Sequence, residues 1–156
     1  MINQTERVAA LFATADLFGR LTSGDRGRLA RRATIRAYPA GSVIIRQGDT
    51  SMTLYVVLTG RVAVEVQARR VRELRAGAFF GEMGLVDDHP RSASVIALED
   101  TECALLSAWD VRQHGGLALG LLPILVQRLR EQTAVSATTD ADWLVLLEGP
   151  AEPRKD

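Results

Sequence analysis

The chain has 156 residues, of which 47% are hydrophobic and 24% are charged. These values are typical of one globular domain with its own core, and they exclude an intrinsically disordered or fibrous protein. Nineteen basic residues balance nineteen acidic ones, so neither nucleic acid nor an anionic lipid surface is the expected partner.

Cysteine content and hydropathy indicate the cellular compartment of the protein. The sequence has one cysteine, Cys103, so it forms no internal disulfide and no thiolate cluster of its own. The longest apolar stretch, from Gly115 to Val126, contains Pro123 and is shorter than the ~18 residues that a membrane helix needs. Polar residues interrupt the first dozen positions, where a signal peptide would be apolar. We therefore expect a cytoplasmic protein with no membrane contact.

Residues 4–33 have the apolar spacing of helices. Val8, Leu11 and Phe12 share one helical face, and Ser23 is the expected N-cap of a second, short helix. Arginines are concentrated here, which on a helix is typical of a solvated face. They are Arg20, Arg26, Arg28, Arg31, Arg32 and Arg36.

Residues 34–106 are predicted to form the β-rich part of the chain. Val62, Val64 and Val66 alternate with polar or small residues, which predicts a strand with one face in a core. Thr59-Gly60 has the length and composition of a hairpin turn. Many short strands with glycine turns favour a sandwich, a jelly roll or a barrel. The β-rich runs are 42–46, 54–58, 61–67, 69–75, 92–98 and 101–106.

The helical pattern returns in residues 107–133. Ser107 and Asp110 form a variant capping box, and a second helix runs from about 117 or 123 to 133. An apolar stripe on this helix favours a parallel homodimer, with packing on the chain's own barrel as the alternative. The stripe is Leu122, Leu125, Val126 and Leu129. Residues 134–156 are weakly patterned and are predicted to be a C-terminal tail.

The segment from Phe79 to Val95 does not fit a plain β sandwich. A turn that begins at Gly81 presents backbone N–H groups, which bind anions, and the guanidinium of Arg91 matches two phosphate oxygens. Glu82 would repel a phosphate alone, but its carboxylate accepts hydrogen bonds from sugar hydroxyls. The residues therefore favour a small ligand with a phosphate beside a ribose hydroxyl, and a surface ion pair between Glu82 and Arg91 is the alternative.

This segment resembles the phosphate-binding cassette of the cyclic nucleotide-binding domains. That family includes the catabolite activator protein, the regulatory subunits of cyclic-AMP-dependent protein kinase and the nucleotide-gated channels. Its cassette reads Phe-Gly-Glu-(apolar)-(small)-Leu, a short loop, then Pro-Arg-(Ser/Thr/Ala)-Ala, and the chain matches it from Phe80 to Leu85 and from Pro90 to Ala93. The resemblance covers about residues 18–133. It implies a mainly β fold with flanking α-helices, an eight-stranded jelly-roll barrel within a domain at 1–133.

The resemblance also implies roles for individual residues. Glu82 accepts from the ribose 2′-hydroxyl, and Arg91 pairs with the cyclic phosphate. The backbone around Gly81, Glu82 and Met83, together with Ser92, donates to the phosphate oxygens. Ala93 completes the ligand-binding motif. Leu85 corresponds to an apolar hinge contact with the C-terminal helix.

Ligand preference and base contacts are less closely defined. Ser92 directly after the arginine resembles the bacterial activator and favours cyclic AMP (cAMP), with cyclic GMP (cGMP) as the other candidate. Family members cover the base with a residue from the C-terminal helix or beyond. Gln132, Thr133 and Trp143 are the positional candidates here.

The resemblance implies a regulatory sensor without catalytic activity, and we expect no cofactor or metal. His89 and His114 are the only histidines, too few for the metal site of a cupin enzyme. No helix-turn-helix pattern follows the second helix, so no direct DNA binding by this chain is expected, and the output partner is not identified. The alternative function is a jelly-roll interaction module that has kept the fold without the nucleotide switch.

Overall fold

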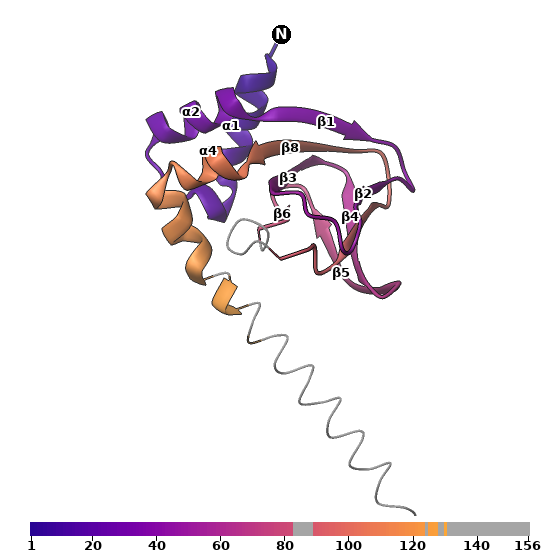
Figure 1. Cartoon of the computed structure of the whole chain (residues 1–156). Helices are drawn as coiled ribbons and strands as arrows, with labels where there is room; N and C mark the ends of the chain where they lie inside the picture. The colour runs from indigo at the N-terminus through magenta and orange to yellow at the C-terminus, as the bar shows by residue number, and fades with distance from the viewer. Residues whose placement is uncertain (83–88, 124, 128–129, 131–156) are drawn as a thin grey trace, which may run out of the picture. The chain divides into compact units, whose positions relative to one another are not determined.

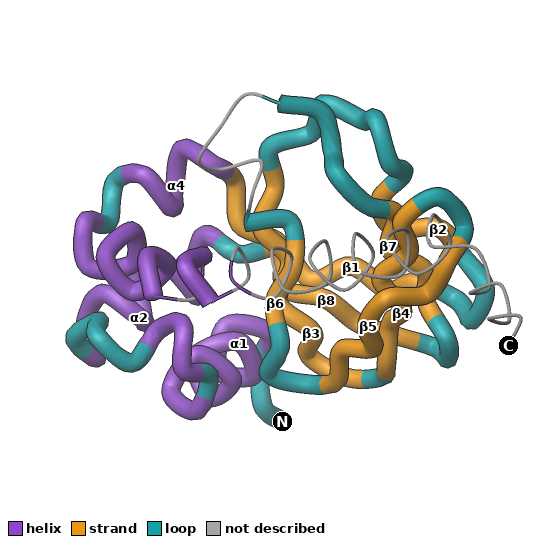
Figure 2. Tube along the Cα trace, turned by 90° about the horizontal axis from the view of Figure 1, so that it is seen from below, coloured by secondary structure: helices purple, strands orange, loops and turns teal. Residues whose placement is uncertain are grey.

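The computed structural model describes residues 1–82, 89–123, 125–127 and 130. Residues 1–121 form one compact unit, and a second unit begins at Leu122. In the first unit, eight strands form two antiparallel sheets, ordered β1-β8-β3-β6 and β2-β7-β4-β5 (Figures 1 and 2). This confirms the predicted jelly roll with flanking helices. The strands are β1 (Thr34–Tyr38), β2 (Val43–Ile45), β3 (Thr53–Thr59), β4 (Arg61–Val66), β5 (Arg69–Arg75), β6 (Phe79–Phe80), β7 (Ser94–Ala97) and β8 (Thr101–Ser107).

Chain crossings between the sheets define this topology. Among the described strands, β4 and β5 are the only successive pair within one sheet. The predicted hairpin at Thr59-Gly60 is therefore wrong, because β3 and β4 lie in different sheets. Gly60 has a φ of +88°, and a Cβ there would lie 2.6 Å from the carbonyl oxygen of Asp100. Glycine fits this crossing because it has no Cβ.

The alternating valines of β4 face the core only in part. Val62 is buried and Val64 is half-buried, but Val66 is 36% exposed. The register shifts between Val64 and Glu65, so the alternation is interrupted before the strand ends. The hairpin that follows is built from Gln67 and Ala68, whose φ angles of 49° and 62° are unusual for residues other than glycine.

Two strands, β1 and β6, are not among the β-rich runs of the sequence. β1 lies at a sheet edge and is half-buried to exposed, so its apolar alternation is weak. β6 has two residues, Phe79 and Phe80, and it forms by pairing with Val56 and Tyr55 of β3. A strand this short has no periodicity of its own, because its conformation depends on its partner.

A cluster of apolar side chains fills the space between the sheets. Its buried members are Ile45, Tyr55, Val57, Val62, Leu74, Phe80, Val95 and Cys103. Cys103 is a free thiol, and burial raises its pKa to about 12.

The N-terminal helices occupy the predicted segment, and they gather at one end of the strands (Figures 1 and 2). They are α1 (Gln4–Thr14), the 3-10 helix η1 (Asp16–Phe18) and α2 (Ser23–Arg32). Ser23 is not the N-cap of α2, because the hydroxyl of Thr22 accepts from the N–H of Asp25. Arg28 and Arg32 of α2 are 70% and 65% exposed, as expected for a solvated arginine face.

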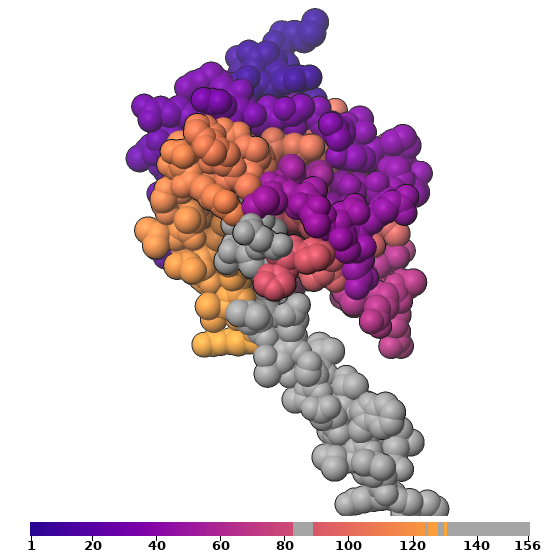
Figure 3. Space-filling view, in the orientation of Figure 1, coloured from indigo at the N-terminus to yellow at the C-terminus, as the bar shows by residue number. Residues whose placement is uncertain are grey.

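The C-terminal part of the first unit begins with α4 (Ala108–Arg112), whose N-cap is the predicted Ser107. A further helix begins at residue 115, earlier than the sequence indicated. It lies beside the N-terminal helical segment (Figure 3), and a Cβ on Gly120 would be 2.9 Å from the carbonyl oxygen of Leu17. In the second unit, residues 122–123, 125–127 and 130 are helical. The predicted helix end at 133 and the tail lie outside the described residues.

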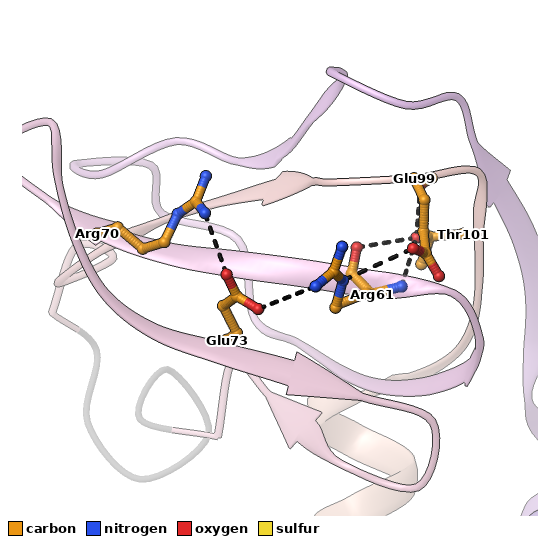
Figure 4. A network of polar contacts seen from close by, with 5 residues as sticks. All are labelled: Arg61, Arg70, Glu73, Glu99 and Thr101. Atoms are coloured by element: carbon orange, nitrogen blue, oxygen red, sulfur yellow. Dashed lines mark hydrogen bonds and ion pairs between the residues drawn. The ribbon is translucent and has the colours of Figure 1, made fainter.

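Charged side chains form a network of ion pairs on the outer face of the sheet β2-β7-β4-β5 (Figure 4). Arg61 pairs with Glu73 at 3.3 Å and with Glu99 at 3.6 Å, and Arg70 reaches the other oxygen of Glu73 at 3.1 Å. The hydroxyl of Thr101 accepts from the N–H of Arg61 at 3.2 Å. This network uses none of the cassette residues. Across the part of the chain that is described, no helix has the length and apolar character to cross a bilayer.

Candidate functional site

Arg91 lies at the centre of the predicted ligand site, in the segment that leads into β7. Its backbone N–H donates to the carbonyl of Asp49 at 2.7 Å, and its carbonyl accepts from the N–H of Gly48 at 2.8 Å. The loop between β2 and β3 therefore holds the main chain of Arg91 at a fixed place, although about forty residues separate them.

The guanidinium of Arg91 is buried, with 6% of the residue exposed. Nη1 donates to the carbonyl of Gly81 at 2.7 Å, while Nη2 donates to the carbonyl of Thr53 at 2.8 Å and the hydroxyl of Ser51 at 3.0 Å. Nε is buried and has no hydrogen-bond partner in the described part of the chain. Burial lowers the pKa of Arg91, because removal from water penalises the charged form. The site therefore holds a desolvated cation whose Nε–H is not used by the described residues.

Gly81 connects β6 to this guanidinium. Its φ is +84°, and an added Cβ would lie 2.6 Å from the Thr53 carbonyl oxygen and 3.1 Å from Nη1 of Arg91. The preceding residue, Phe80, stacks on Tyr55 with ring centroids 4.9 Å apart, which fixes the end of β6 against β3. Gly81 is thus required by both its conformation and the closeness of its neighbours.

The remaining described cassette residues differ in exposure. Glu82 is 1% exposed, so the alternative of a surface ion pair between Glu82 and Arg91 is wrong, because neither residue is at the surface. Ser92 is exposed and Ala93 is half-buried. The structure thus brings Gly81 against Arg91, with Glu82 and Ser92 as their chain neighbours.

Several predicted residues lie outside the described residues. They are Met83, Leu85, Gln132, Thr133 and Trp143. Conversely, Ser51 and Thr53 hold Arg91 but were not found from the sequence. Thr53 acts through its main-chain carbonyl, which leaves no signature in the amino-acid type, and Ser51 lies 40 residues before Arg91. Within the described ranges, no group of three or more histidine, cysteine or acidic side chains is placed to hold a metal ion.

The chain belongs to the cyclic nucleotide-binding domain family, whose sequence model matches residues 35–114. The match includes the whole barrel from β2 to β8 and the cassette between β6 and β7.

Relatives within this family have different outputs. The chain is 40% identical to a cyclic AMP receptor protein from Thermus thermophilus over 105 residues, which are 62% of this chain and 49% of that protein. It is 31% identical to a cGMP-dependent protein kinase from Plasmodium berghei over 115 residues, 74% of this chain and 13% of the kinase. The crystal structure of the Thermus thermophilus catabolite activator protein superposes with a TM-score of 0.70 at 34% identity, covering 84% of this chain and 63% of that one. The chain thus spans half or less of the length of these two curated relatives.

Proposed function

We propose that the chain binds a 3′,5′-cyclic nucleotide, cAMP ahead of cGMP, and acts as a non-catalytic regulatory sensor in the cytoplasm. The observation that carries the proposal is the buried Arg91 guanidinium, which has a donor unused by the described residues and no ion-pair partner among them. A desolvated cation of this kind is stabilised by an anion, and a cyclic phosphate carries one negative charge. Glu82 is the proposed acceptor for the ribose 2′-hydroxyl, and the backbone of Gly81 and Met83 with Ser92 are the proposed phosphate donors.

The preference for cAMP rests on Ser92, which follows Arg91 as in the bacterial activators. The similarity to the cyclic AMP receptor protein of Thermus thermophilus supports it, whereas the similarity to a cGMP-dependent kinase keeps cGMP as the competing ligand. Gln132, Thr133 and Trp143 are the proposed base contacts. Alanine substitution of the residue that covers the base should change the ratio of the two affinities, while a residue that does not touch the base leaves the ratio unaltered.

Titration of the purified chain with cAMP, cGMP and 5′-AMP tests the proposal. A ligand that binds only the native state raises the melting temperature as its concentration exceeds the dissociation constant. Arg91→Ala should weaken binding by roughly 2–5 kcal/mol, or about thirtyfold to several thousandfold, because the phosphate loses its paired charge. The matched control is Arg31→Ala, which removes an exposed arginine of α2. A flat thermal series up to millimolar cyclic nucleotide would favour the alternative, an interaction module without a ligand.

The proposed output is a shift of the C-terminal helix, with a homodimer formed through the stripe at Leu122, Leu125, Val126 and Leu129. Leu122 and Val126 are 54% and 46% exposed, which supports an apolar face open to a partner. A ligand shifts such an equilibrium only if it binds the two states differently. Hydrogen exchange should therefore show ligand-dependent protection both at 80–93 and after 123. Sedimentation of Leu122→Glu beside the wild type tests the dimer.

A further inference from the structure

The positive charge of Arg91 is held by uncharged groups. Its three hydrogen bonds go to the carbonyls of Gly81 and Thr53 and to the hydroxyl of Ser51. Asp49 opposes the lowering of the pKa of Arg91, yet its carboxylate forms no ion pair with the guanidinium in the described part of the chain. At 6% exposure, water screens this charge poorly. Among the described residues, the hydrogen-bond partners of this guanidinium are therefore all uncharged.

Ser51 is the only one of the three acceptors that uses a side-chain atom. The Thr53 carbonyl is fixed by the start of β3, and the Gly81 carbonyl is fixed by the turn after β6. The Ser51 residue is exposed and precedes β3, so it contributes little to the core. Of the three acceptors around Arg91, the Ser51 hydroxyl is thus the one that a substitution can change without disturbing the barrel.

We infer that Ser51 is a positioning residue for the ligand's phosphate and that the site requires an uncharged side chain at position 51. This inference rests on the proposed function. The hydroxyl orients Nη2 of Arg91 while leaving the charge of the guanidinium for an anionic ligand to neutralise. A carboxylate at the same position would accept the same hydrogen bond, but it would also compete with the phosphate for that charge. Ser51 therefore orients the guanidinium without placing a negative charge beside it.

Four variants separate these two roles. Ser51→Asp introduces the competing carboxylate, Ser51→Ala removes the acceptor, and Ser51→Thr keeps the hydroxyl. Thr50→Asp is the matched control, because it adds the same charge at the adjacent exposed position, where the structure shows no hydrogen bond to Arg91. Calorimetric titration with cAMP should show Ser51→Asp binding at least about tenfold more weakly than Thr50→Asp, Ser51→Ala weakened severalfold, and Ser51→Thr close to wild type. Equal affinities of Ser51→Asp and Thr50→Asp would overturn the inference.

A second arm without ligand separates this inference from the proposed function. If an aspartate at 51 balances Arg91, the ligand-free Ser51→Asp protein should melt about 2–4 °C above Thr50→Asp. That difference should vanish when Arg91→Met is introduced into both, as a double-mutant cycle requires of a direct interaction. If wild type binds no cyclic nucleotide, the proposed function fails, and this arm still tests whether Ser51 lies against Arg91. Equal melting temperatures, or a difference that persists with Arg91→Met, would contradict the placement of Ser51 against Arg91.

Discussion

Gly81 and Gly77 offer a sharp test of how the candidate site is built. Both residues have positive φ angles, +84° and +88°, but their surroundings differ. A Cβ on Gly77 would meet nothing within 4 Å, whereas a Cβ on Gly81 would lie 2.6 Å from the Thr53 carbonyl oxygen and 3.1 Å from Nη1 of Arg91. Alanine at Gly77 therefore adds backbone strain alone, and alanine at Gly81 adds the same strain and a collision inside the site.

The magnitudes follow from these two contributions. A left-handed conformation costs a residue with a Cβ about 1–2 kcal/mol, and this is the whole effect expected for Gly77→Ala. The contact at 2.6 Å is with main chain, which cannot rotate away, so the strand or the turn must shift at a further cost of about 1–3 kcal/mol. Gly81→Ala should therefore lower the free energy of unfolding by about 2–5 kcal/mol. The same Cβ would also lie 3.1 Å from Nη1 of Arg91, so the affinity of the Gly81→Ala protein for cAMP should fall by about tenfold or more.

Urea denaturation of the two variants and wild type measures the first effect, and calorimetric titration with cAMP measures the second. Gly77→Ala should keep wild-type affinity while losing some stability. If Gly81→Ala were no less stable than Gly77→Ala, or if both bound cAMP equally well, the close approach of Gly81 to Arg91 and Thr53 would be refuted.

Three further substitutions test the described fold. Ala68→Gly should raise the free energy of unfolding by about 0.5–1 kcal/mol because it relieves a φ of 62°, measured by urea denaturation against Ala76→Gly, whose position has no positive φ and should gain nothing. Gly120→Ala should lower the melting temperature although alanine has the better helix propensity, because the added Cβ would lie 2.9 Å from the Leu17 carbonyl oxygen. The control is Gly115→Ala, whose Cβ meets nothing within 4 Å. Equal destabilisation by the two substitutions would contradict the close packing at Gly120. Cys103 should resist iodoacetamide at pH 8 in the folded protein. Because the pKa of its thiol is raised to about 12 in the folded protein, the thiol of the unfolded chain ionises first as the pH rises above about 9. The free energy of unfolding should therefore fall toward pH 12 by up to about 1.4 kcal/mol per pH unit. Cys103→Ala should lack this contribution, and an unchanged slope in that variant would contradict the burial of the thiol.

Prediction from the sequence succeeded where the signal is local. The N-cap at Ser107 formed as expected, because an N-cap depends on groups three residues apart: the Ser107 hydroxyl accepts from the N–H of Asp110. The carboxylate of Asp110 accepts from that hydroxyl and not from the N–H of Ser107, so the reciprocal bond of a capping box is not formed. The strand positions from β2 to β4 follow from runs rich in β-branched residues between turn residues. The cassette was recognised because the glycine, the glutamate and the arginine are chemically distinctive residues in a fixed order.

The failures concern what each segment pairs with. Thr59-Gly60 resembles a hairpin turn, yet β3 pairs with β8 and β6 while β4 pairs with β5 and β7. The Thr59-Gly60 dipeptide has the same composition whether the chain returns to its own sheet or crosses to the other. The N-cap of α2 is Thr22 and not the predicted Ser23 for a similar reason, since both residue types cap helices and only the hydrogen bond to Asp25 distinguishes them.

The sequence by itself thus determined most of the elements, the fold class and the identity of the ionic groups in the candidate site, because propensities, turns and side-chain chemistry are properties of neighbouring residues. Only the tertiary structure decided how Arg91 is held. Its guanidinium meets the Thr53 carbonyl, the Gly81 carbonyl and the Ser51 hydroxyl, which come from segments 10 to 40 residues away. Two of these acceptors are main-chain atoms that every residue carries, so their role arises from chain crossings between the two sheets and has no trace in residue type.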